Sequence, residues 1–205
     1  MTTLVLLRHG ETPLTPGRRI SGSSGSDPAL SPDGRRQARA TADALAHRGG
    51  IEAVVTSPMR RCRETAESVA TRLGLTVRVD RDLREADFGA WEGMTFAEVR
   101  ERYPDDLSAW LASPEAPPSG AGETMHEVTL RTAAVRDALL ARYAGATVLV
   151  VSHVGPLRTL IRLALQAPPP TLFRMEVAAA SLSTVSYDED GTATVQSLND
   201  THHLT

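Results

Sequence analysis

The sequence contains no lysine: all 22 of its basic residues are arginine. A lysine Schiff base, a lysine general base and a phosphate loop ending in Gly-Lys-Ser/Thr are therefore excluded. The formal net charge is only -3, and the arginines form no cluster larger than pairs such as Arg18-Arg19 and Arg35-Arg36. We therefore expect no direct nucleic-acid binding, and any anion has to be bound locally.

Cysteine and long apolar runs are also scarce. The single cysteine, Cys62, can form neither an internal disulfide nor a thiolate metal site. The N-terminal apolar run covers only residues 4–7, which is too short for a signal peptide, and the apolar run over 146–165 is interrupted by His153, Arg158 and Arg162. These features predict a cytoplasmic protein with no membrane association.

The remaining composition is that of a globular chain. Its 205 residues are 41% hydrophobic and 23% charged, and this length fits a single domain over residues 1–205. Apolar strands are expected near 4–7, 51–55, 76–79 and 147–151, alternating with helices near 33–47, 57–73, 123–143 and 156–165. The alternation predicts an α/β fold, a three-layer α/β/α sandwich with a largely parallel central sheet.

Three segments fall outside this alternation. Residues 13–32 are rich in Gly, Ser and Pro and are expected to form a long loop. Residues 80–125 hold both tryptophans and a Pro-Pro breaker, and they predict an inserted cap region. Residues 182–198 show two apolar runs around Asp-Glu-Asp-Gly, which predicts a hairpin.

Two histidines follow the ends of predicted strands. Arg8 and His9 come directly after the first strand, and His153 follows Ser152 at the end of the strand near 147–151. In open α/β sheets, ligands bind beyond the carboxyl ends of the strands. Imidazole is the common proton carrier and nucleophile near neutral pH, so the matched pair favours a catalytic site over two unrelated loop histidines.

An arginine is expected near a neighbouring strand end. Arg60 lies in the first turn of the helix that follows Thr56-Ser57-Pro58, and its guanidinium and the free N–H groups of that helix start suit a phosphate. Arg61 and Arg63 are expected to be solvated helix residues. Together, Arg8, Arg60 and the two histidines suit a tetrahedral dianion.

Four motifs carry a family resemblance. They are Leu-Arg-His-Gly-Glu-Thr at 7–12, Ser-Pro-Met-Arg-Arg-Cys-Arg-Glu-Thr-Ala at 57–66, Leu-Arg-Glu-Ala-Asp-Phe-Gly-Ala-Trp-Glu-Gly at 83–93 and Val-Ser-His-Val-Gly at 151–155. In this order and spacing, they resemble the histidine phosphatase (phosphoglycerate mutase-like) superfamily over nearly the whole chain.

The resemblance implies roles for specific residues. The phosphorylated nucleophile falls on His9 and the acid/base on Glu85, while the phosphate clamp falls on Arg8, Arg60 and His153. It also implies substrate contacts at Thr15, Ser21 and Gly22, and it implies neither a cofactor nor a metal. In this chemistry His9 attacks the phosphorus of a small phosphate monoester, a protonated His153 helps to hold the oxygens, and Glu85 protonates the leaving oxygen.

The branch within the superfamily is a separate expectation. Phe88 stands where mutases have a tyrosine, and lysine is absent, so a phosphoglycerate mutase is the less favoured alternative. Residues 18–30 and 87–93 resemble α-ribazole phosphatases, and most closely the phosphatase domain that some actinobacterial proteins carry behind a ribonuclease H domain. The expected substrates are α-ribazole 5′-phosphate or a sugar or nucleotide phosphate.

Several alternatives stay open. From a different class, the chain could be a non-catalytic phosphoryl-binding scaffold, and a homodimer and a functional link to ribonuclease H are both compatible with the resemblance. His126 borders the predicted substrate loop but is interpreted as a helix-surface residue. Trp91 is interpreted as packing the cap.

Overall fold

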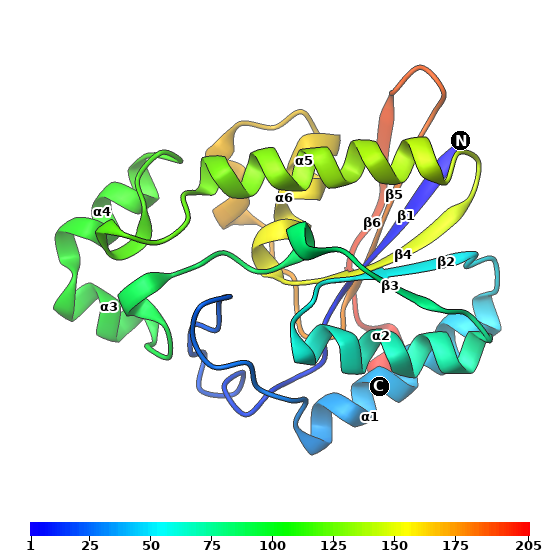
Figure 1. The fold of residues 1–205 in the computed structure, drawn as a ribbon, viewed down its shortest axis with the longest axis horizontal. Helices are drawn as coiled ribbons and strands as arrows, with labels where there is room; N and C mark the ends of the chain where they lie inside the picture. Colours follow the sequence, from blue (N-terminus) through cyan, green and yellow to red (C-terminus); the bar gives the residue numbers. More distant parts are fainter.

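The computed structural model describes residues 1–205 as one central sheet between two pairs of helices (Figure 1). The strands are β1 (Thr2–Arg8), β2 (Ala53–Thr56), β3 (Val77–Val79), β4 (Thr147–Ser152), β5 (Leu182–Tyr187) and β6 (Ala193–Asp200). The helices are α1 (Pro32–Arg48), α2 (Arg60–Leu73), α3 (Phe96–Arg102), α4 (Pro104–Ala112), α5 (Met125–Arg142) and α6 (Val154–Ala164). The predicted three-layer α/β/α sandwich is confirmed. None of the helices is long and apolar enough to cross a membrane.

The sheet has six strands in the order β3-β2-β4-β1-β5-β6. Parallel pairing joins the first four strands of this order, whereas β5 and β6 form the predicted antiparallel hairpin beside β1. In the register of β1 and β4, Arg8 lies opposite Ser152. The next residue of each chain segment is a histidine, so this register brings His9 and His153 to the same edge.

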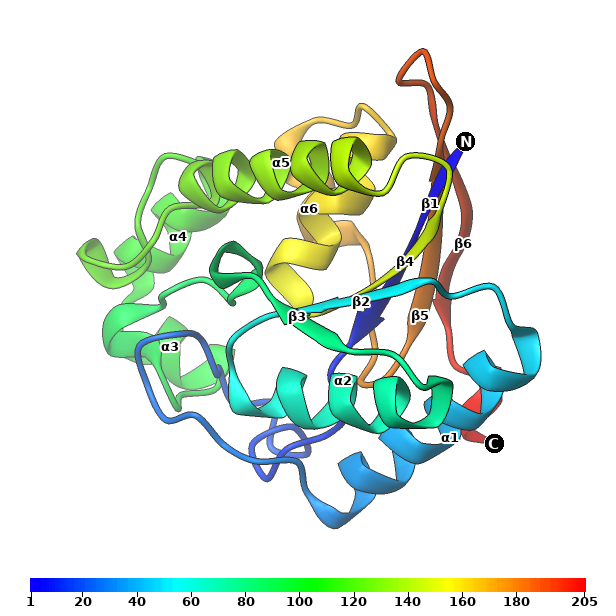
Figure 2. The same cartoon turned by 45° about the vertical axis from the view of Figure 1, so that its right-hand side comes forward.

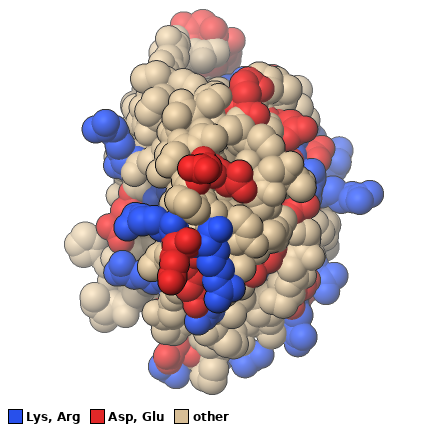
Figure 3. All heavy atoms as spheres, turned by 90° about the vertical axis from the view of Figure 1, so that its left-hand side faces the viewer, with Lys and Arg blue, Asp and Glu red and all other residues tan.

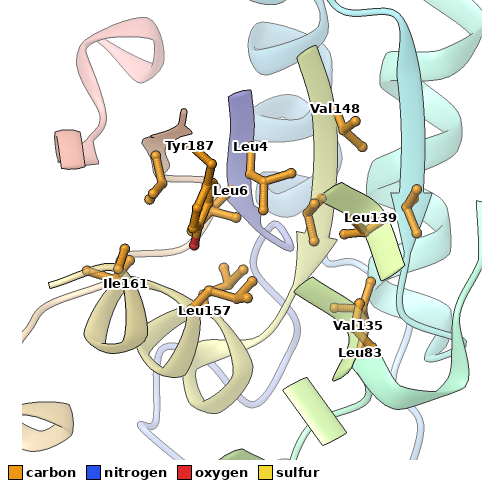
Figure 4. Close-up of a cluster of buried hydrophobic side chains, with 14 of the residues drawn as sticks. Leu4, Leu6, Leu83, Val135, Leu139, Val148, Leu157, Ile161 and Tyr187 are labelled. Carbon is orange, nitrogen blue, oxygen red and sulfur yellow. The ribbon is translucent and has the colours of Figure 1, made fainter. Parts of the chain in front are cut away.

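Two hydrophobic cores hold the layers together. The aliphatic residues of β1 and β4 alternate between them, as expected for strands buried on both faces. Leu4, Leu6 and Val148 face α5 and α6 with Leu139 and Leu157 (Figure 4). On the other face, α1 and α2 cover the sheet (Figure 2). Their side chains in this core include Ala42, Leu45, Cys62, Ala66 and Val69.

Local signals set several helix boundaries. The Ser31 hydroxyl accepts a hydrogen bond from the N–H of Gly34 at 3.0 Å, which caps α1 where the sequence predicts its start. Thr124 and Glu127 form a capping box at the start of α5. Helix α4 was not predicted, because only Leu107 and Trp110 are buried along it and its pattern is too weak to stand out.

The cap predicted near residues 80–125 contains α3 and α4, which lie at one end of the sheet (Figure 1). It has a core of its own that includes Trp91, Val99, Leu107 and Trp110. Ile20 from the long loop over residues 13–32 is buried in the same core. Loop and cap therefore pack together over the edge of the sheet that carries the two histidines.

Candidate active site

His9 lies at the end of β1 with its side chain almost completely buried. Its Nδ1 is 2.7 Å from the carbonyl oxygen of Gly10. Since a carbonyl only accepts hydrogen bonds, Nδ1 carries the proton, and Nε2 keeps its lone pair. Burial, and then the charges of Arg61 and Arg8, hold the pKa of His9 well below its ordinary value. His9 is therefore a neutral imidazole whose Nε2 stays free to act as a nucleophile even in mildly acidic solution.

His153 lies beside His9 and is completely buried. The two rings meet edge to face with centroids 5.2 Å apart. The Nε2 of His153 is 2.7 Å from the Ser57 hydroxyl oxygen. Burial, followed by the charges of Arg61, His9 and Arg8, places the pKa of His153 well below its usual range. In the unliganded site the positive charge therefore belongs to the arginines, and a protonated His153 in the complex with substrate stays a prediction.

The structure separates Arg60 from the two histidines. Its side chain is 57% exposed and its Nε donates to Glu64 of the next helical turn at 2.8 Å. Arg61 is instead completely buried, and its charge is the strongest one acting on both His9 and His153. The placement of Arg60 at the anion site is therefore wrong, and so is the solvated position expected for Arg61.

Arg61 is held by the backbone of the long loop. One terminal nitrogen donates to the carbonyl oxygens of Ser21 and Gly22 at 2.9 and 3.2 Å. The other lies 3.5 Å from a carboxylate oxygen of Asp27. Its Nε has no hydrogen-bond partner although it is buried. This leaves donor capacity on a buried cation next to the two histidines, which is a suitable arrangement for an anion.

The start of α2 is occupied by the protein itself. The carboxylate of Asp27 accepts the N–H of Arg60 at 2.9 Å, and the Ser57 hydroxyl accepts the N–H of Met59 at 3.3 Å. The N–H groups of Met59 and Arg60 are therefore not free to bind a phosphate, whereas the N–H of Arg61 has no hydrogen-bond partner in the protein. Asp27 takes the position at the positive end of the helix dipole that an anion would favour.

Arg8 supplies the second positive charge at the histidine pair. One terminal nitrogen donates to the carbonyl oxygen of Val177 at 2.7 Å, which fixes the direction of the side chain. Its Nε is buried and has no hydrogen-bond partner. Arg8 and Arg61 thus each present an unused N–H near His9, and the predicted place of Arg8 at the site is consistent with this geometry.

Glu85 lines a cavity that His9 and Arg8 also line, and its side chain is almost completely buried. Its carboxylate accepts the N–H groups of Ala86 and Gly155 at 2.9 and 3.2 Å. Burial raises the pKa of Glu85 despite these hydrogen bonds and the charges of Arg61 and Arg131. Gly155 is needed for this approach, because a Cβ at that position would collide with the carboxylate. The result is a carboxylic acid that keeps its proton to a higher pH than usual.

An ion-pair network holds the segment that carries Glu85. Arg131 of α5 binds both carboxylate oxygens of Glu123 at 2.7 and 2.9 Å, and it donates to the carbonyl oxygens of Asp82 and Arg84. The N–H of Glu123 donates to the carbonyl oxygen of Asp87 at 2.8 Å. The backbone is thereby fixed on both sides of Glu85.

The three predicted substrate contacts occupy different positions. Thr15 lines the cavity, and its hydroxyl accepts the N–H of Thr12 at 3.0 Å. Ser21 also lines the cavity and has a hydroxyl without a hydrogen-bond partner. The N–H of Gly22 is bound to Glu92 at 2.8 Å and its carbonyl to Arg61. Gly22 therefore positions Arg61, and its N–H is not available for a substrate.

Several of these side chains line a cavity of about 570 Å³. Arg8, His9 and Glu85 contribute to it, and so does Arg158 of α6, whose charge acts on Glu85. The sequence offers no local signal for Arg158, which only the packing of α6 brings into the cavity. The other lining residues are mainly apolar and come from the long loop, the cap and the segment after α6, namely Leu14, Ile20, Phe88, Phe96, Trp110, Leu111, Met125, Leu172 and Phe173.

The residues interpreted as structural keep that role. Trp91 is completely buried and packs edge to face on Trp110 at 5.8 Å. His126 is 47% exposed and pairs with Glu115 on the surface. Burial raises the pKa of the Cys62 thiol to about 12, so Cys62 is not a nucleophile.

The surface around the site has charges of both signs. The face that carries α3 and α4 shows arginine and acidic side chains next to one another (Figure 3). No group of three or more His, Cys, Asp or Glu side chains is placed so that it could hold a metal ion. The cation set around His9 consists of arginines.

Comparisons with known proteins give a match along almost the whole chain. Residues 4–201 match the histidine phosphatase superfamily (branch 1). The bifunctional protein Rv2228c of Mycobacterium tuberculosis is 48% identical over 203 residues, which cover 99% of this chain and 55% of that protein. The chain thus spans about half the length of this relative.

Two further proteins are similar over nearly their full length. Phosphoserine phosphatase 1 of Hydrogenobacter thermophilus is 31% identical over 204 residues, which cover 100% of this chain and 95% of that protein. The solved structure of the mycobacterial glucosyl-3-phosphoglycerate phosphatase Rv2419c with VO3 has a TM-score of 0.86 and 31% identity, and the match covers 97% of this chain and 99% of that one.

Proposed function

Because this chain belongs to the histidine phosphatase superfamily, we propose that residues 1–205 form one domain that hydrolyses small phosphate monoesters through a phosphohistidine on His9. The observation that carries this proposal is the free Nε2 of His9, buried between the charges of Arg8 and Arg61 and facing the same cavity as Glu85. A nucleophile, two cations and a protonated acid are the parts that in-line phosphoryl transfer requires.

The reaction has two displacements. In the first, His9 Nε2 bonds to phosphorus while the ester P–O bond breaks, and Glu85 donates its proton to the leaving oxygen. In the second, Glu85 takes a proton from water as the water oxygen bonds to phosphorus, and the N–P bond breaks to release inorganic phosphate. Arg8, Arg61 and His153 hold the phosphoryl oxygens, on which charge lies in both transition states.

The proposed substrates are α-ribazole 5′-phosphate or a sugar or nucleotide phosphate. Phosphoserine phosphatase 1 and the glucosyl-3-phosphoglycerate phosphatase are similar proteins with small organic phosphates in their names. A phosphoglycerate mutase is disfavoured because Phe88 lines the cavity and the chain has no lysine to bind a second acidic group. A silent scaffold is disfavoured because nucleophile, cations and acid are all present.

A screen of phosphate release tests the proposed function. The purified chain is incubated with sugar phosphates, nucleotides and ribazole phosphate, and inorganic phosphate is measured. We expect release from several monoesters and no transfer between positions of a bisphosphorylated sugar acid. Transfer without release would favour the mutase, and binding without release would favour the scaffold. The ribonuclease H link stays a prediction that this screen does not address.

The Glu85→Gln substitution tests the proton donor. For alkyl phosphates the leaving alkoxide is strongly basic, so we expect kcat/KM to fall by about 10²–10⁴-fold. For p-nitrophenyl phosphate the leaving phenolate is stable without a proton, and the loss should be much smaller. Equal losses on both esters would contradict the assignment of Glu85 as the acid, and vanadate binding serves as the control for an intact site.

The same residues set the expected pH dependence. Because the pKa of Glu85 is raised, its protonated form persists to a higher pH, and kcat/KM for an alkyl phosphate should decline only as the pH rises through that value. Because the pKa of His9 is lowered, the nucleophile stays unprotonated in mild acid. Glu85→Gln should remove the alkaline decline. An unchanged alkaline limb in this variant would contradict the assignment.

Metal independence is a further expected result. Arg8 and Arg61 supply the positive charge that metal ions supply in many phosphatases, so EDTA should leave the rate nearly unchanged. Vanadate should inhibit, because it adopts the trigonal bipyramidal geometry of the transition state. The solved complex of the glucosyl-3-phosphoglycerate phosphatase with VO3 supports this expectation. An activity that EDTA abolishes and magnesium or zinc restores would contradict it.

A further inference from the structure

Aromatic residues are few in this chain, and half of them gather in one place. They make up 4% of the sequence, with three phenylalanines, two tryptophans and three tyrosines. All three phenylalanines and Trp110 line the cavity that also contains His9. They come from separate segments, since Phe88 follows Glu85, Phe96 and Trp110 lie on α3 and α4, and Phe173 follows α6.

The four rings form a continuous wall around Trp110. The ring of Phe173 meets that of Trp110 edge to face at 4.9 Å, and those of Phe96 and Phe88 lie 6.2 and 6.3 Å from it. Phe96 and Phe173 are 45% and 38% exposed. Leu111 beside them is 50% exposed. A wall of this kind leaves apolar surface in contact with water until a ligand covers it.

The wall itself carries no charged group. Of the arginines that line the same cavity, Arg19 donates to the carbonyl oxygen of Gly93 at 2.8 Å and to Glu98 at 3.1 Å. The side chains of Arg18 and Arg158 make no hydrogen bond and no ion pair, and the Nε of Arg158 is buried without a partner. These guanidiniums lie in the lining beside the rings, so the surface of the rings binds a ligand only through apolar contact.

We infer that the leaving group of the substrate carries a flat, uncharged aromatic ring system that packs on the wall of Phe88, Phe96, Trp110 and Phe173. This inference rests on the proposed function, because it places the phosphate of the same molecule at His9. Aromatic surfaces recognise such rings by offset or edge-to-face contact. The wall favours this class over amino-acid and sugar-acid phosphates, which are small and polar and have no ring to cover the apolar surface.

The experiment compares esters that share their reacting atoms. Adenosine 5′-monophosphate and ribose 5-phosphate both lose the phosphate from a primary 5′-oxygen, and only the first carries an uncharged aromatic base. Phosphoserine adds a small, polar leaving group without a ring. We expect kcat/KM for adenosine 5′-monophosphate to exceed that for ribose 5-phosphate by about 5- to 100-fold, the usual effect of stacking one base on aromatic side chains. Phosphoserine should likewise fall below the nucleotide.

Variants assign the preference to the wall. Phe173→Ala and Phe96→Ala remove exposed rings and should lower kcat/KM for the nucleotide several-fold while leaving ribose 5-phosphate nearly unchanged. Leu130→Ala is the matched control, since Leu130 is a 58% exposed apolar residue outside the cavity lining. Equal kcat/KM for the nucleotide and ribose 5-phosphate, or a preference that survives both phenylalanine substitutions, would overturn the inference. Failure of the proposed function would instead appear as no phosphate release from any ester.

Discussion

His9→Ala is expected to abolish phosphate release from every ester. The variant lacks the only imidazole that combines a fixed Nδ1 proton, a free Nε2 and a place at the cavity. The alternative nucleophiles are unsuitable, because His153 is completely buried against Ser57 and burial raises the pKa of Cys62 to about 12. Initial rates with p-nitrophenyl phosphate give the most sensitive measurement, since that leaving group needs least assistance.

The phosphohistidine itself can be trapped. Rapid quenching of the wild-type reaction at high pH should preserve a phosphoprotein that acid destroys, and peptide mapping should place the phosphate on His9. His47→Ala is the control, since His47 is an exposed histidine on α1 and its removal should leave the rate and the trapped species unchanged. Substantial activity in His9→Ala, or a phosphate mapped to another residue, would contradict the mechanism.

Arg61→Ala should lose about 10³–10⁵-fold in kcat/KM, the range typical of an arginine that stabilises a transferring phosphoryl group. Arg60→Ala should change kcat/KM by less than about 3-fold, because its exposed ion pair with Glu64 is of the kind that contributes little. The two residues are adjacent in sequence and identical in chemistry. The comparison therefore isolates position as the cause of the difference.

Arg61 also binds the carbonyl oxygens of Ser21 and Gly22, so Arg61→Ala could unfold the loop as well as remove charge. Arg61→Lys keeps the charge but loses the planar guanidinium, and we expect it to fold and to recover only part of the activity. Thermal melting of each variant separates folding from catalysis, and vanadate affinity reports the anion site. If Arg60→Ala lost as much activity as Arg61→Ala, the assignment of the anion site to Arg61 would be wrong.

The contrast between Arg60 and Arg61 shows what cannot be predicted from the sequence alone, namely which of two adjacent arginines is buried at the site. Helical spacing correctly predicts that Cys62, Ala66 and Val69 face the core. The same spacing puts Arg61 one turn before Thr65, whose hydroxyl accepts the N–H of Gly10 at 3.1 Å. That hydrogen bond joins segments 55 residues apart and is visible only in the folded chain. An arginine beside the core stripe of an isolated helix is usually solvated, so the helical pattern by itself does not identify Arg61.

Asp27 illustrates the same limit. A helix start with free N–H groups is an anion site only when nothing else occupies it, and here the long loop brings Asp27 to α2. The carboxylate lies 33 residues from Arg60 in sequence. No local pattern encodes such an approach, because it depends on how the Gly-rich loop over residues 13–32 folds back across the sheet edge.

The layers of this protein, and the sheet edge that carries its histidines, can be predicted from the amino-acid sequence. Apolar runs and helical spacing are local patterns that show which residues are buried, and a strand buried on both faces has to be covered by helices. The residues after β1 and β4 are histidines by sequence alone, and parallel pairing then brings them to one edge. Only tertiary contacts place Arg61 beside these histidines, keep His153 neutral in the free protein and bring four distant aromatic rings together into one wall. Each of these depends on burial and on contacts between segments far apart in the chain, which fix pKa values and side-chain positions only once the loop and the cap have closed over the sheet.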